Sequence, residues 1–80
     1  MSYDIEKIDE YAIALLYLGM HGREEGFGAR AWKSFDWEAM NRLHEKGMMA
    51  NPATKAKSVM MTEEGYKQAK ALFEKHFLKS

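Results

Sequence analysis

The side chains that could hold a metal ion in this chain are histidines and carboxylates, because it contains no cysteine. His21, His44 and His76 lie far apart, and none has a histidine or carboxylate at ligand spacing on the same helix face, apart from His21 near Glu24 and Glu25. A zinc site needs ligands at defined spacing, and catalysis needs a nucleophile beside a base or paired carboxylates in a cleft. Neither pattern occurs. We therefore expect no metal, no cofactor, no catalytic residue and no enzymatic activity.

Three glycines, Gly22, Gly26 and Gly28, interrupt the stretch from His21 to Ala29. Their spacing matches no phosphate-binding fingerprint, and the two glutamates between them would repel an anion. Glycine also increases the conformational entropy that a segment loses when it becomes ordered. We interpret this stretch as a mobile loop and expect no small-molecule ligand.

Basic side chains form the first of two candidate binding surfaces. The candidate nucleic-acid-binding residues are Asn41, Arg42 and Lys46 on the polar face of a predicted helix, and Lys55 and Lys57 in a predicted turn. The cations would contact phosphates while Asn41 reads a base edge. A solvated charged face with local ion pairs is the alternative interpretation. The chain carries twelve basic and twelve acidic side chains, whereas dedicated nucleic-acid binders are usually basic.

Aromatic and methionine side chains form the second candidate surface. Its residues are Trp32, Phe35 and Trp37, which are close enough in sequence to cluster, together with Met49 and Met60 from two methionine pairs. Tryptophan is enriched at the energetic centres of protein interfaces, and exposed methionine adapts to varied partners. This surface predicts a protein-interaction module. The alternative is that the aromatic residues close one end of the core and the methionines pack against helices.

Eighty residues provide one hydrophobic core, so we expect a single domain over residues 1–80. Asp4 is the predicted N-cap of a first helix, Asp36 of a second helix that ends before Gly47, and Thr62 of a last helix. From Tyr11 onward the first helix is apolar nearly all round. That pattern is typical of a central helix or of a dimer interface.

Two short strands are predicted between the second and last helices, at Met48–Ala50 and Lys57–Met61. Strand alternation should turn Val59 and Met61 inward and their neighbours outward. Residues Arg30–Phe35 form only a short segment before the second helix. The predicted fold is α+β and mainly α, in the order helix, loop, short segment, helix, two-stranded β-hairpin, helix.

The stretch from Leu43 to Met49, followed by Met61-Thr62-Glu63-Glu64-Gly65, resembles part of the MarR- and PadR-type winged-helix regulators. In them it spans the end of the recognition helix, the wing and the next helix. The resemblance implies a winged-helix-like fold with a helix-turn-helix that binds double-stranded DNA as a transcriptional regulator or accessory factor. It also implies a homodimer, because one half-site offers few contacts. Residues 30–37 give the chain a further resemblance, to a small family of uncharacterised bacterial proteins.

Two features depart from the regulator pattern. Fifteen residues separate the first helix from Asp36, and after a glycine-rich loop they leave too little room for another helix. Asp36 and Glu38 also place carboxylates at the start of the candidate recognition helix, where the field of the phosphates opposes them. DNA binding and protein interaction therefore stand as two hypotheses.

The cellular setting is predicted from what the chain lacks. Its longest apolar run, Tyr11–Met20, has ten residues, whereas a membrane span needs about twenty. The N-terminus has no basic region ahead of an apolar stretch, as a secretory signal would, and an absence of cysteine suits a reducing compartment. We expect a cytoplasmic protein without membrane contact.

Overall fold

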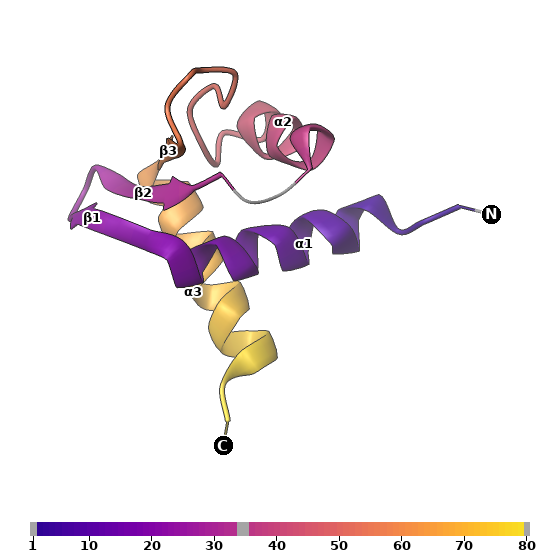
Figure 1. The fold of residues 1–80 in the computed structure, drawn as a ribbon. Coiled ribbons are helices and arrows are strands. Elements are labelled where there is room, and N and C mark those ends of the chain that lie inside the picture. The colour runs from indigo at the N-terminus through magenta and orange to yellow at the C-terminus, as the bar shows by residue number, and fades with distance from the viewer. Residues whose placement is uncertain (1, 34–35, 80) are drawn as a thin grey trace.

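Three α-helices and a three-stranded antiparallel sheet form the fold within residues 2–33 and 36–79, the part of the chain that this computed structural model describes (Figure 1). The sheet has the strand order β1-β2-β3. The predicted α+β class is therefore confirmed. The elements, in chain order, are α1 (Ile5–Leu16), the 3₁₀ turn η1 (Tyr17–Gly19), β1 (Met20–Glu24), β2 (Gly28–Trp32), α2 (Trp37–Glu45), β3 (Ser58–Met61) and α3 (Glu63–Phe77).

Each α-helix begins where a side chain accepts a hydrogen bond from an otherwise unpaired backbone amide. Asp4 accepts from the first turn of α1 at 3.0 Å, and Asp36 accepts from the first turn of α2 at 3.2 Å. The hydroxyl oxygen of Thr62 accepts from the first turn of α3 at 2.9 Å. These contacts confirm the three predicted N-caps.

The prediction of a mobile loop from His21 to Ala29 is wrong, because these residues form most of the β1–β2 hairpin. Met20 pairs with Ala31, and the chain turns through Gly26, whose φ is 86°. Its glycines therefore permit a tight turn rather than disorder. The strands form because β3, which is distant in sequence, gives β2 a second partner for its backbone hydrogen bonds.

The predicted hairpin between α2 and α3 forms only in part. Its second strand is β3, in which Val59 and Met61 are buried and Met60 is exposed, as the alternation predicts. Its first strand is reduced to a single bridge between Met49 and Met61. The main partner of β3 is instead β2, with Ala29 opposite Met61.

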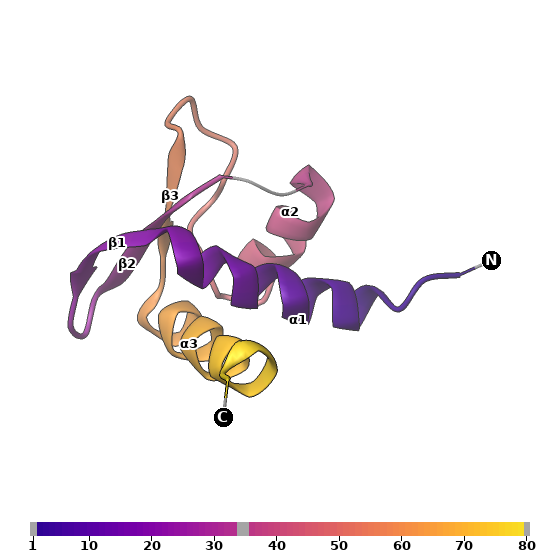
Figure 2. The same ribbon diagram turned by 60° about the horizontal axis from the view of Figure 1, so that its bottom comes forward.

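The core lies where the helices meet the inner face of the sheet. Figures 1 and 2 show α1 between α2 and α3, with α3 crossing it. Close approach of backbones is part of this packing: a Cβ atom at Gly65 would lie 1.8 Å from the carbonyl oxygen of Met48. The buried core residues are Ile13, Leu16, Ala31, Met40, Leu43, Met49, Val59, Met61 and Ala69.

The segment between α1 and α2 does not follow the helix-turn-helix order. Where a helix-turn-helix would place a helix, the described residues form β1 and β2. The small residues Ala29 and Ala31 are buried on β2, which lets the sheet approach the helices closely. The fold is thus α+β with an additional hairpin in place of a second helix.

Candidate interaction surface

Two of the predicted nucleic-acid-binding cations are paired with a buried carboxylate of α1. Arg42 of α2 donates to both oxygens of Asp9, at 2.8 Å for each closest contact, and Lys46 donates to it at 3.3 Å. Asp9 is buried, and the hydrogen bonds from Arg42 lower its pKa even though burial acts in the opposite direction. Both cations therefore hold α1 against α2. Asn41, on the same helix, is exposed.

The other two predicted cations, Lys55 and Lys57, are exposed in the segment that leads to β3. Lys33 joins them, because its ammonium group donates to the carbonyl oxygen of Thr54 at 2.9 Å and to its hydroxyl oxygen at 3.0 Å. Lys33 could not be assigned to this group from the sequence, because it lies far from Lys55 and Lys57 along the chain. The structure thus gathers three lysines around one segment.

The predicted aromatic and methionine surface is divided by the fold. Trp32 stacks on His21 with ring centroids 4.5 Å apart, whereas Trp37 lies near the ammonium group of Lys33. Both tryptophans are half-exposed, as is Met60. Phe35 lies outside the described residues.

The expectation that Met49 is exposed is wrong, because this side chain is buried in the core. The backbone of Met49 forms a bridge with that of Met61 in β3, and the side chains of both residues are buried. Of the predicted pair, Met60 alone reaches the surface.

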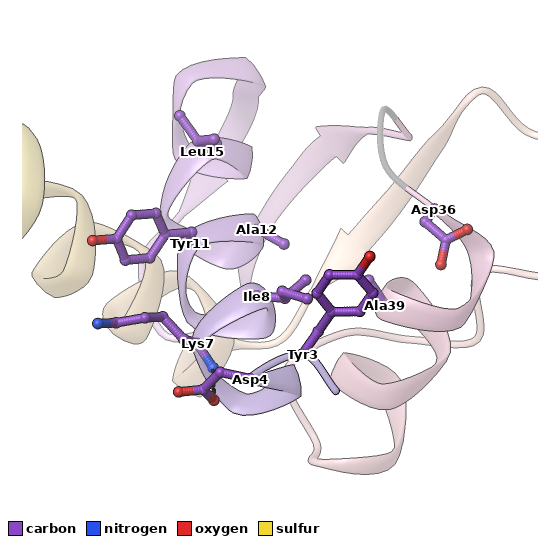
Figure 3. A pocket seen from close by; sticks show the side chains of 9 residues that line it. All are labelled: Tyr3, Asp4, Lys7, Ile8, Tyr11, Ala12, Leu15, Asp36 and Ala39. Carbon is purple, nitrogen blue, oxygen red and sulfur yellow. Dashed lines mark hydrogen bonds between the residues drawn. The ribbon is translucent and has the colours of Figure 1, made fainter. Parts of the chain in front are cut away.

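A groove of about 450 Å³ runs along α1 beside the start of α2 (Figure 3). Its lining includes the small side chains of Ala12 on α1 and Ala39 on α2, which are both buried. Larger side chains and three charged groups at the helix starts complete it. The full lining is Tyr3, Asp4, Lys7, Ile8, Tyr11, Ala12, Leu15, Asp36 and Ala39.

The groove exists because α1 has two apolar sides and the fold covers only one of them. Ile13 and Leu16 face the core. Ile8, Tyr11, Leu15 and Leu18 follow each other at spacings of three, four and three residues and remain exposed. We call these four residues the outer seam. Helical spacing of three and four places side chains in one line along a helix.

Polar contacts from two neighbouring helices fix the position of α1, and hence of the outer seam. Asp9 ties α1 to α2 as described above. On the other side, His76 of α3 lies 3.0 Å from Glu10, and this hydrogen bond lowers the pKa of Glu10. Tyr11 packs beside the same histidine, with ring centroids 4.5 Å apart. The outer seam is therefore presented by a helix anchored at both flanks.

A further ion pair joins the β1–β2 hairpin to α3. Arg23 donates two hydrogen bonds to the carboxylate of Glu63, at 2.9 and 3.1 Å, and its guanidinium lies 3.9 Å from the ring centre of Tyr66. Glu63 also accepts from the amide of Gly28 at 3.0 Å. These hydrogen bonds, led by the one from Arg23, lower the pKa of Glu63. The pair is a structural contact that orders the hairpin.

In residues 2–33 and 36–79, no three histidine or carboxylate side chains gather closely enough to hold a metal ion. No helix in these ranges combines the length and the apolar character needed to cross a bilayer.

Together these features define a small α+β domain with an open apolar groove. The chain belongs to the family described as a domain of unknown function, DUF6429, whose model matches residues 4–79. It is 40% identical over 77 residues to the uncharacterized protein y4hR of Sinorhizobium fredii. These residues are 96% of this chain and 97% of that protein. No solved structure gives a significant match. The predicted resemblance to an uncharacterised bacterial family is confirmed, while the winged-helix resemblance stays a prediction.

Proposed function

We propose that this protein is a protein-interaction module that binds its partner through the outer seam and the groove beside it. The observation that carries the proposal is the exposure of an apolar line on a helix whose opposite side already lies in the core. A folded monomer gains nothing from leaving such a line in water, because burial of apolar surface is the main favourable term in association.

The apolar surface along this helix is large for so small a protein. Six side chains retain between 36% and 72% of their surface: Tyr3, Ile5, Ile8, Tyr11, Leu15 and Leu18. At about 200 Å² for a whole large side chain, this amounts to roughly 600 Å². The largest apolar patch on a typical monomer is about 300–600 Å² and often functional. The four residues of the outer seam contribute roughly 370 Å² of this surface, which is within the range of the largest apolar patch on a monomer.

The groove has the layout of an interface rather than of a random patch. Its floor at Ala12 and Ala39 leaves space for a side chain from a partner, and Tyr11 beside it is of a type enriched at interface centres. The charged groups of Asp4, Lys7 and Asp36 lie in the same lining. An apolar centre with a polar rim is the usual anatomy of a protein interface.

The test is affinity capture from a bacterial lysate with wild-type protein, Leu15→Glu and a matched control. Phe27→Glu is the control, because Phe27 is also apolar and 73% exposed but lies in the β1–β2 turn, outside the groove. We expect partners to be retained by wild type and control and lost with Leu15→Glu, while circular dichroism shows all three folded. Retention of the same captured partners by Leu15→Glu as by wild type and control would reject the outer seam as the binding surface.

Trp32, Trp37 and Met60 are the other protein-binding candidates, since all three are half-exposed although the fold divides them. A Trp37→Ala variant in the same capture experiment separates Trp37 from the outer seam. Loss of the partner with Trp37→Ala, and not with Leu15→Glu, would move the proposal to Trp37.

DNA binding is the second candidate function, and the grouping of Lys33, Lys55 and Lys57 favours it. In the winged-helix resemblance, α2 is the recognition helix and the segment before β3 is the wing, so these lysines would contact phosphates. The counterargument is that Arg42 and Lys46 are already paired with Asp9. Binding to random duplex DNA should then appear at low salt and fall steeply with added salt, with a shallower slope for Lys55→Ala/Lys57→Ala. Absence of binding at low salt would exclude this candidate.

A further inference from the structure

We propose that the partner of the outer seam is a second copy of this chain, whose α1 packs antiparallel across a twofold axis near Tyr11 and Ala12. This inference rests on the proposed function and names its partner. It implies a homodimer in which each groove is completed by the other copy.

The spacing of the outer seam is that of a helix that pairs with another helix. Two helices pack side by side when apolar residues recur alternately at three and four residues, since this keeps one line of side chains facing the partner. Ile8, Tyr11 and Leu15 satisfy this spacing over about 10 Å of α1, and Leu18 continues it in the adjoining turn η1. A flat sheet edge or an extended peptide would not require it.

The groove and the side chains beside it are self-complementary. A twofold interface uses the same patch on both copies, so each patch must contain both the protruding side chains and the hollow that receives them. Here the protruding side chains are Ile8, Tyr11 and Leu15, and the hollow lies at Ala12 and Ala39.

An axis between Tyr11 and Ala12 gives apolar pairs along the whole helix. Each residue then faces the residue of the other copy for which the two residue numbers add up to 23, as 11 and 12 do. Tyr11 faces Ala12 of the other copy and Ile8 faces Leu15. Leu18 in turn faces Ile5, and both of these side chains are exposed in the single chain. Of the charged groups in the groove lining, Asp4 falls opposite Gly19 and Lys7 opposite Leu16, which is buried in the core of its own copy.

Charge favours the antiparallel arrangement over the parallel one. Parallel helices would bring Asp4 against Asp4 and Lys7 against Lys7, and they would align the two helix dipoles. Antiparallel helices oppose the dipoles and separate the like charges. The net charge of zero also means that two copies do not repel each other at long range.

The available area suits a stable dimer. A standard interface buries about 800 Å² on each partner, of which roughly 55–65% is apolar. The apolar surface of roughly 600 Å² on α1 and on its flanking residues Tyr3 and Leu18 meets that need. A domain of this size buries only about 60–65% of the surface that its unfolded chain exposes, which is less than a larger domain buries, so association would also add to its stability.

Oligomeric state is the first measurement, by light scattering and sedimentation over a range of concentrations. We expect wild type and Phe27→Glu to dimerise, and Leu15→Glu to raise the dimer dissociation constant at least about 100-fold, because its carboxylate would be desolvated in the seam. A Leu15→Glu dimer as tight as wild type would overturn the proposal.

Orientation is tested by single cysteines, since the natural chain has none. A disulfide needs Cα atoms within about 7 Å. Under mild oxidation Tyr11→Cys should link to its own copy because it lies near the axis, whereas Leu18→Cys alone should not. A mixture of Ile5→Cys and Leu18→Cys should give the mixed disulfide. Efficient linkage of Leu18→Cys to itself would overturn the antiparallel arrangement.

Failure of this inference can be told apart from failure of the proposed function. A wild-type protein that stays monomeric at high concentration, with no Tyr11→Cys linkage, overturns the dimer. If capture of another protein is then still lost with Leu15→Glu, the outer seam is an interface for that other protein, and the proposed function survives the loss of the second copy.

Discussion

Replacing Asp9 by alanine should destabilise the protein by about 2–3 kcal/mol. The buried carboxylate accepts from Arg42 and Lys46, so its removal leaves two cations without their partner at the junction of α1 and α2. Loss of one member of a buried pair costs about 3–5 kcal/mol. Arg42 and Lys46 retain 29% and 48% of their side-chain surface, and the water that reaches them reduces the cost.

This effect is large relative to the whole stability, which is about 4–12 kcal/mol for a chain of this length. It corresponds to a fall in Tm of roughly 10–20 °C. The assay is thermal and urea denaturation followed by circular dichroism, with Glu6→Ala as control because Glu6 is an exposed carboxylate on the same helix. A change in unfolding free energy below about 0.5 kcal/mol, or one equal to that of the control, would refute the assignment of Asp9 as the anchor of α1.

Three further predictions concern the packing of Gly65, the ion pair of Glu63 and the dependence of stability on pH. Gly65→Ala should lower the unfolding free energy by about 2 kcal/mol or more, as denaturation would measure, because the new Cβ meets the backbone oxygen of Met48. Glu63→Gln should speed hydrogen exchange of the β1–β2 hairpin amides, since the ion pair with Arg23 is lost; unchanged exchange would count against that role. The lowered pKa values of Asp9 and Glu63 mean that their folded forms hold the proton less tightly than the unfolded chain. Their stabilisation is present above about pH 4–4.5 and is lost as pH falls further, which denaturation at a series of pH values will check.

The helices and their starts could be predicted because their causes are local. Asp4, Asp36 and Thr62 each accept from an amide two or three residues further along the chain, so short sequence windows contain the whole interaction. The alternation of β3 is local for the same reason, and the burial of Val59 and Met61 follows from it.

The β1–β2 hairpin could not be predicted from short sequence windows. Its glycines are typical of a loop in isolation, and its stabilising contacts come from distant residues. Gly28 shows the difference: its amide donates to Glu63, and a Cβ there would lie 2.0 Å from the backbone oxygen of Met61. Such a position requires glycine for close packing, which no local pattern distinguishes from flexibility.

The candidate interaction surface also depends partly on the sequence and partly on the tertiary structure. The sequence by itself determined that the first helix is apolar on nearly every side, since that depends only on residue types at helical spacing. Only the tertiary structure decided which side is covered, because the contacts of Asp9 with Arg42 and Lys46 join α1 to a helix that is distant in sequence. Burial depends on packing between segments that are distant in sequence. The outer seam of Ile8, Tyr11, Leu15 and Leu18 is exposed because α2 and α3 pack against the other sides of α1.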